Sequence, residues 1–316
     1  MLIPFQEEIV NFTNDSGERI HGVYNYTTKD RPLIVIPPQF EKTIRTNLTA
    51  MLYLINNGFN VFRYDNRYSN GNSTGEIVDY TLGGVYDDLC DVMKMLQSNS
   101  CIDTRHGVGI LGISISSRVI YRYLKLHPSN ADVFVSLVGV VNMQHTISTI
   151  VGFDVIQEKL NNPQQQYGVR KVLKYPINWD QFAPDMIGQN YHTLESTKQD
   201  IDGMTTPTYL IVSEKDQWVA IEEYQTAFQD NTAILRESYK LPGADHELYK
   251  NPETGRYALE KIVTLFRKFY QIDIGSDSLI KPTVTEVIQM NRQEREREQR
   301  QMLEEKILTK GESVVQ

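Results

Sequence analysis

The chain has 316 residues, a length that suits one large α/β domain with an insertion or two modest domains. Its net charge of −8 and pI near 5.4 argue against nucleic acid or an anionic membrane as a partner, because these require a basic surface. The longest apolar run, residues 133–141, is too short to cross a bilayer, and no signal peptide is visible. The two cysteines, Cys90 and Cys101, offer no disulfide framework. These features predict a cytoplasmic protein.

Apolar strands alternate with amphipathic helices along most of the chain. A hairpin is expected first, over residues 5–27. Further strands are predicted at residues 33–36, 59–65, from 108, 132–140, 207–213 and 233–241, with helices over 43–57, 80–98 and from 115 to about 127. This alternation indicates a doubly wound, mostly parallel sheet with helices on both faces, and its active site should lie at the carboxyl ends of the strands.

The regular alternation stops near residue 141 and resumes near residue 206. We therefore predict an α/β core of residues 1–141 and 206–277 with a lid or cap over 142–205. An insertion at this point lies over the carboxyl ends of the strands, so it is suited to selecting the substrate, although it is also explicable as decoration. Alternating charges over 278–316 predict a solvated helix or a tail that buries little area. The alternative is an interaction helix, presenting Met290, Met302, Leu303, Ile307 and Leu308.

The most informative segment is 108–118, where an apolar strand runs into a turn of small residues and then a helix. Such an elbow exposes the hydroxyl of Ser114 at the strand end, where backbone N–H groups of the following helix meet an oxyanion. The pattern is G-x-S-x-S rather than G-x-S-x-G, with Ser116 in place of the second glycine. Serine is small enough for close packing, but the motif alone also fits Ser114 as a helix cap.

Two later residues follow strand ends in the order Ser, Asp, His, which is the order of the triad in α/β-hydrolases. Asp216 comes after the strand at 207–213, and His246 lies in the loop after the strand at 233–241. In this triad the histidine transfers the serine proton and the aspartate orients the imidazole. We therefore predict an α/β-hydrolase fold with Ser114, Asp216 and His246 as catalytic residues. The weaker candidates are Asp245 as the acid and His145 or His192 as the base.

Two backbone N–H groups are expected to form the oxyanion hole. One belongs to Ile115, and we assign the other to Phe40, in the loop after the strand at 33–36. Gln39 stands where glycine is usual, so Phe40 is also suited to be a wall of the substrate pocket. The sequence has neither metal-ligand spacing nor a nucleotide-binding fingerprint, so no metal or cofactor is expected, and we interpret both cysteines as structural.

With these residues placed, the chain resembles the fatty-acyl transferases of bacterial bioluminescence operons, which are myristoyl-acyl-carrier-protein thioesterases. The similarity extends to about Asn291 and is most specific at residues 57–65, 114–119, 138–142 and 216–219. That family also has serine two residues after its nucleophile. The resemblance implies cleavage of long-chain acyl thioesters through an acyl-serine intermediate, with Ser114, Asp216 and His246 matching the family's nucleophile, acid and base.

The partners implied are an acyl thioester on acyl carrier protein or coenzyme A, and a fatty-acid reductase or synthetase complex. The loop around Phe40, the insertion over 157–190 and the charged tail depart from the family pattern, which leaves the acyl chain length and the operon context open. The final acceptor and the oligomeric state are open as well. Another serine hydrolase is the alternative function, either an editing thioesterase of a polyketide or peptide synthetase pathway or a carboxylesterase. The alternative that is not an enzyme is a non-catalytic scaffold that delivers acyl chains to a reductase complex.

Overall fold

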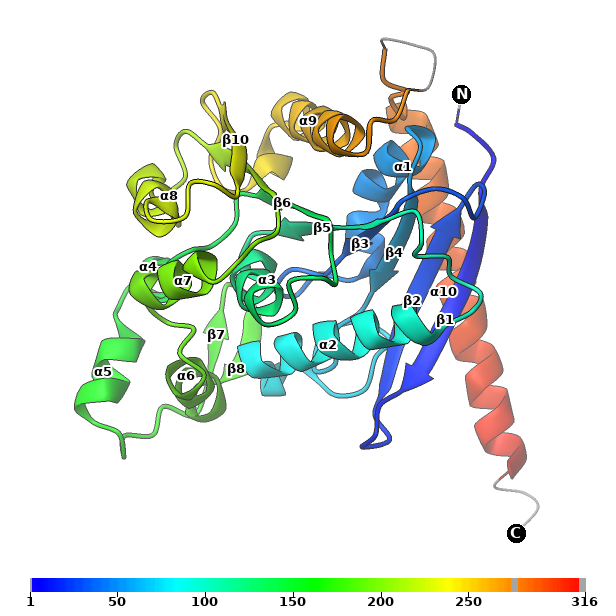
Figure 1. Ribbon diagram of the computed structural model, residues 1–316. Helices are drawn as coiled ribbons and strands as arrows, with labels where there is room; N and C mark the ends of the chain where they lie inside the picture. The colour runs from blue at the N-terminus through cyan, green and yellow to red at the C-terminus, as the bar shows by residue number, and fades with distance from the viewer. Residues whose placement is uncertain (1, 274–277, 313–316) are drawn as a thin grey trace.

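A mostly parallel sheet forms the centre of the molecule (Figure 1). The computed structural model describes residues 2–273 and 278–312, with the backbone alone at 249, 298 and 301–312. The strands of the central sheet are β1 (Gln6–Thr13), β2 (Arg19–Tyr26), β3 (Leu33–Ile36), β4 (Asn60–Tyr64), β5 (Val108–Ile113), β6 (Val133–Leu137), β9 (Thr208–Ser213) and β10 (Leu235–Leu241). In this part of the chain their spatial order is β1-β2-β4-β3-β5-β6-β9-β10.

The strand pairing confirms the predicted doubly wound sheet. The hairpin β1–β2 is antiparallel and joins β4 in an antiparallel pair, whereas the strands from β4 to β10 pair in parallel. Strands β3, β4, β6 and β9 are buried at every residue, because helices cover both faces of the sheet. Strand β6 ends at Leu137, short of the predicted residue 140, because the chain turns there toward the site described below.

Helices cover the sheet in two layers. They are α1 (Leu48–Asn56), α2 (Leu82–Ser98), α3 (Ile115–Leu126), α7 (Leu194–Asp202), α8 (Ile221–Phe228) and α9 (Pro252–Tyr270), with short 3-10 helices η1 (Ile44–Asn47), η2 (Ile77–Asp79) and η3 (Leu248–Lys250). The apolar side chains of α1 and α9 form one core against the sheet. Those of α2, α3, α7 and α8 form the other, on the opposite face. Each face is thus closed to water by its own set of amphipathic helices.

The segment between β6 and β9 lies beside the core (green in Figure 1). It contains α4 (Met143–Val151), α5 (Val155–Asn161), the hairpin of β7 (Val169–Val172) and β8 (Tyr175–Asn178), α6 (Trp179–Gly188) and α7. Its buried side chains join the apolar cluster of α2 and α3, and β8 also contacts η2. Because α7 packs against α3 and α8, the predicted lid over 142–205 ends in a helix that belongs to the core layer.

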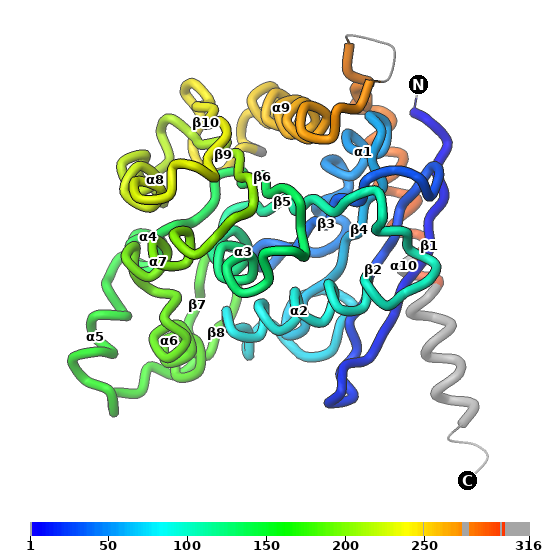
Figure 2. Tube along the Cα trace, viewed as in Figure 1, coloured from blue at the N-terminus to red at the C-terminus, as the bar shows by residue number. Residues whose placement is uncertain are grey.

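The C-terminal segment forms a helix that packs on the core. This helix, α10 (Val284–Glu312), lies beside α1 (Figure 2). Val287 and Met290 pack on the apolar cluster of α1 and α9, and Glu294 is only 3% exposed. The expectation of a solvated tail that buries little area is therefore wrong for the first part of α10. The other apolar residues considered for an interaction face lie outside the described side chains: Met302, Leu303, Ile307 and Leu308.

Helix length and hydropathy also bear on membrane contact. Helix α10 is the longest of the described helices, but it is densely charged from Arg292 onward. Within residues 2–273 and 278–312, no helix is both long enough and apolar enough to span a bilayer.

Candidate active site

Ser114 lies on a strained elbow between β5 and α3. Its backbone has φ 56° and ψ −127°, a conformation that costs energy for a residue with a side chain and is typical of functional turns. Gly112 makes the sharp turn possible, since a Cβ there would lie 2.6 Å from Ile120 Cδ1 and 2.8 Å from Phe134 Cε2. The elbow therefore depends on the absence of a side chain two residues before the serine.

Ser116 takes the place of the second glycine of the usual elbow motif and makes hydrogen bonds that glycine would lack. It is 1% exposed. Its Oγ accepts a hydrogen bond from the Ile113 N–H at 2.9 Å and donates one to the Ile113 carbonyl at 2.9 Å. The hydroxyl therefore ties the first turn of α3 to the end of β5. The departure from the motif is thus compatible with the elbow geometry.

The segment after β6 supports the elbow from the neighbouring strand. The Ser114 N–H donates to the Leu137 carbonyl, and the Val140 N–H donates to the Ser114 carbonyl, both at 3.0 Å. Between these bonds Val138 has φ 43°, a rare conformation for a β-branched residue. Gly139 permits the close approach, because a Cβ there would lie 2.1 Å from a serine hydroxyl of β6. The family-specific segment 138–142 therefore has a structural role next to Ser114.

The structure brings Ser114, His246 and Asp216 into one chain of hydrogen bonds. The Ser114 Oγ lies 2.8 Å from His246 Nε2, and His246 Nδ1 lies 2.8 Å from Asp216 Oδ2. His246 is 8% exposed, so the imidazole is largely screened from water. With the proton on Nδ1 facing the carboxylate, Nε2 is left to accept the serine proton. Asp245, the neighbour of His246, has no part in this chain of bonds.

Groups in and around the family-specific segment 216–219 hold the acid and the base in place. The second oxygen of Asp216, Oδ1, accepts the N–H groups of Trp218 and Val219 at 2.9 and 3.0 Å. The Trp218 ring lies 4.4 Å from the imidazole of His246, centroid to centroid. The Trp218 carbonyl in turn accepts the Thr146 hydroxyl of α4 at 2.8 Å, which links the insertion to the acid loop.

A second polar link joins α4 to the same region. Asn142 caps α4 by accepting the His145 N–H, and its amide donates to Glu223 Oε1 at 2.7 Å. The other carboxylate oxygen of Glu223 accepts the Ala220 N–H at 3.1 Å, at the start of α8. Only Asn142 had a sequence signal, as the last residue of a family-specific segment. Glu223 had none, because its contact with Asn142 joins residues that are far apart in the chain.

The two predicted oxyanion donors lie on separate elements. Ile115 is the first residue of α3, so its N–H has no acceptor within the helix. Phe40 lies in the β3 loop, which we define as residues 37–43, and within the described residues its N–H donates to no protein group. The Phe40 ring packs edge-on against Tyr80 and Tyr175, with centroids 5.1 and 6.1 Å away. Phe40 thus has an N–H that suits an oxyanion donor and ring contacts that suit a wall of the substrate pocket.

The weaker candidates occupy other environments. His145 Nδ1 lies 2.8 Å from Glu223 Oε1, at the surface. Burial lowers the pKa of His192, and its carbonyl accepts an N–H from α4.

Both cysteines are free, and burial raises the pKa of the Cys90 thiol to about 11. Among the described side chains, no group of His, Cys, Asp and Glu is arranged to hold a metal ion.

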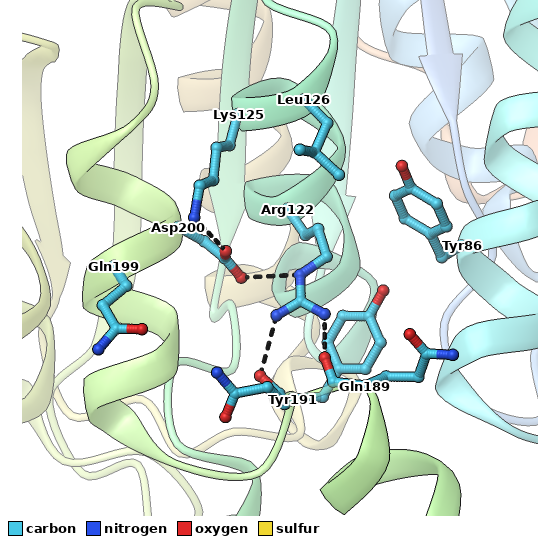
Figure 3. A pocket seen from close by; sticks show the side chains of 9 residues that line it. Tyr86, Arg122, Lys125, Leu126, Gln189, Tyr191, Gln199 and Asp200 are labelled. Atoms are coloured by element: carbon cyan, nitrogen blue, oxygen red, sulfur yellow. Dashed lines mark hydrogen bonds and ion pairs between the residues drawn. The ribbon is translucent and has the colours of Figure 1, made fainter.

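A cavity of about 340 Å³ lies over the C-terminal half of α3 (Figure 3). Its α3 residues begin at Arg122, about two helical turns beyond Ser114. Arg122 and Lys125 each lie 3.2 Å from the Asp200 carboxylate, and Arg122 also donates to the Asn190 carbonyl. These cations already have partners in the protein. The cavity therefore marks where the end of the insertion is anchored to α3 rather than the surroundings of Ser114.

This fold, with a serine on a strand-to-helix elbow, is that of the α/β-hydrolases, and solved structures agree. The monoacylglycerol lipase of Paleococcus ferrophilus matches with a TM-score of 0.62 and 15% identity, over 79% of this chain and 99% of the lipase. The esterase Pf2001 of Pyrococcus furiosus matches with a TM-score of 0.58 and 19% identity, over 84% of this chain and 93% of the esterase. At these identities the likeness is one of fold, and it confirms the predicted fold class.

Sequence comparison then identifies the family. The acyl transferase family model matches residues 20–295. An acyl transferase of Photobacterium phosphoreum is 25% identical over 289 residues, which cover 90% of this chain and 88% of the relative. One of Vibrio campbellii is 26% identical over 261 residues, covering 81% and 79%. The chain belongs to the acyl transferase family, so the resemblance to the acyltransferases of bioluminescence operons is confirmed.

Proposed function

We propose that this acyl transferase cleaves long-chain acyl thioesters of acyl carrier protein or coenzyme A through an acyl-Ser114 intermediate. The observation that carries the proposal is the hydrogen-bond chain from the Ser114 Oγ through His246 to Asp216. A serine hydroxyl is a weak nucleophile by itself, and a neighbouring imidazole oriented by a buried carboxylate activates it.

The reaction proceeds in two halves. In the first, His246 Nε2 removes the Ser114 proton while Oγ attacks the thioester carbonyl, and the N–H groups of Ile115 and Phe40 stabilise the resulting oxyanion. The C–S bond then breaks, and the imidazolium of His246 returns its proton to the leaving thiolate. In the second half, water or another acceptor gives a proton to His246 and attacks the Ser114 ester. The fatty acid is released or handed on, and the serine regains its proton.

Apolar surroundings favour a long acyl chain over a short one. Phe40, in the β3 loop, packs on Tyr80 and on Tyr175 of the insertion, and Phe182 of α6 packs on Tyr80. These rings belong to or pack on one apolar cluster that also includes Ile115. Each methylene group that the substrate buries against such a surface contributes about 0.8 kcal/mol, so chain length is a strong determinant of affinity.

The test is to incubate the protein with acyl-carrier-protein and coenzyme A thioesters of graded length and to measure its intact mass. We expect the wild type to carry an acyl adduct that maps to Ser114, and the fraction of protein acylated should increase with the length of the acyl chain. The Ser114→Ala variant should form no adduct and lose about 10⁴-fold or more in turnover. An adduct on another residue would refute the proposal. Faster reaction with short oxygen esters than with long thioesters would identify a carboxylesterase instead.

A further inference from the structure

A fully buried arginine connects the C-terminal helix to the β3 loop. Arg63, on β4, has no exposed surface. Its guanidinium donates to the Asn25 side-chain oxygen at 3.0 Å, to the Ile44 carbonyl at 2.9 Å and to Glu294 Oε1 at 2.8 Å. The only other carboxylate oxygen within ion-pair distance among the described residues belongs to Glu7, at 3.9 Å. Since a buried cation requires a compensating charge, Glu294 of α10 is the main counter-charge of Arg63.

Ile44, the first residue after the β3 loop, is held at both of its peptide groups. Arg63 binds its carbonyl, and Asp65 Oδ1 accepts its N–H at 2.8 Å. Arg63 and Asp65 are two residues apart and therefore project from the same side of the chain. Asp65 is itself 1% exposed and fixed by the Asn72 N–H at 2.8 Å. The end of the β3 loop thus depends on two buried charged side chains.

We infer that Glu294 is a positioning residue for the β3 loop: through Arg63 and Ile44 it holds the Phe40 N–H where the oxyanion forms. This inference rests on the proposed function, in which that N–H is an oxyanion donor. It gives α10 a role in the reaction, although the helix contributes no group that touches the substrate.

The loss of the Glu294 carboxylate would change the position of the Phe40 N–H for a chemical reason. Without the carboxylate, the buried guanidinium of Arg63 must rely more on the neutral oxygens of Asn25 and Ile44, shift toward Glu7, or admit water. Each of these changes alters the bond that holds Ile44. Oxyanion stabilisation requires donors at hydrogen-bond distance, and a displacement of about 1 Å costs up to about 100-fold in rate.

The first experiment compares Glu294→Ala, Glu294→Gln and the matched control Glu296→Ala. Glu296 lies on the same helix, its side chain is 52% exposed, and its carboxylate pairs with Arg292. We expect Glu294→Ala to lower kcat for acylation by about 10- to 100-fold with KM unchanged, because an interaction made in the transition state is weakened. Glu294→Gln keeps an acceptor oxygen but loses the charge, so its kcat should lie between those of Glu294→Ala and the wild type, and Glu296→Ala should match the wild type.

A second measurement separates positioning from loss of folding. A long-chain trifluoromethyl ketone forms a tetrahedral serine adduct whose oxyanion uses the same donors, whereas a free fatty acid does not need them. Glu294→Ala should bind the ketone about tenfold more weakly and the fatty acid as the wild type does. Hydrogen exchange should rise in residues 40–47 and stay unchanged in β5.

The two proposals fail in different ways. Unchanged kcat, ketone affinity and loop exchange in a folded Glu294→Ala variant overturn the inference, with acylation of wild-type Ser114 intact. Equal losses of ketone and fatty-acid affinity also overturn it, since they indicate general damage. A wild type that never acylates Ser114 overturns the proposed function, and the inference with it.

Discussion

The elbow of Ser114 is supported by neutral backbone hydrogen bonds from the next strand, whereas the β3 loop is held by buried charges from distant parts of the chain. Ser114 exchanges N–H and C=O bonds with residues 137 and 140. Arg63 instead receives its counter-charge from Glu294, 231 residues further along. Backbone bonds tolerate most side-chain changes, but a buried ion pair fails when either partner is lost. The two sides of the site should therefore respond differently to mutation.

The largest effect on turnover in this comparison is expected from mutating the acid, Asp216. Local N–H groups of Trp218 and Val219 hold its carboxylate. Asp216→Asn should lower turnover by about 10³- to 10⁴-fold without unfolding the protein, because the imidazole loses its orientation. Asp245→Asn is the matched control, since Asp245 is the neighbour of His246 but takes no part in the hydrogen-bond chain from Ser114 to Asp216. Steady-state rates together with thermal unfolding measure both variants. A larger loss from Asp245→Asn at equal stability would show that Asp216 is not the acid.

Next in size is the removal of α10. A chain that ends at residue 283 exposes the apolar surface under Val287 and Met290 and leaves Arg63 without its main counter-charge. We expect a loss of about 3–5 kcal/mol in the free energy of unfolding, measured by urea denaturation. A chain that ends at residue 300 keeps these contacts and is the control. Equal stability of the two truncated chains would refute the role of α10 in the core.

A smaller effect is expected from overpacking the strand that supports the elbow. Gly139→Ala places a Cβ 2.1 Å from the Ser136 hydroxyl, so the segment must shift. We expect about 1–3 kcal/mol of destabilisation and a fall in kcat with the fold retained, because the shift reaches Ser114 through its hydrogen bonds. Gly188→Ala, at a position with open space and no positive φ, controls for the alanine itself. A change in stability without any change in kcat would contradict the coupling.

The smallest effect should come from Ser116→Ala. This change removes the two hydrogen bonds to Ile113 but leaves the elbow geometry and its close packing intact. We expect about 1–2 kcal/mol of destabilisation and a kcat within about threefold of the wild type, since each neutral bond contributes about 1 kcal/mol. Thermal unfolding and steady-state kinetics test this. A kcat loss like that of Gly139→Ala would mean that the hydroxyl itself positions Ser114.

The sequence by itself determined the alternation of strands and helices, the fold class and the positions of Ser114, Asp216 and His246. Each of these depends on local patterns: apolar periodicity, small residues at a turn, and polar residues just past a strand end. Because parallel strands bring their carboxyl ends to one edge, the order of the residues was enough to predict that they meet.

Only the tertiary structure decided how these residues are held. The charged pattern of α10 predicted a solvated helix, because a sequence window shows Glu294 as one acid among many and cannot show that Arg63 lies buried opposite it. The positive φ of Val138 and the link from Thr146 to Trp218 were equally invisible. Such contacts join residues that are remote in the chain, so they arise only when the sheet and its helices have packed.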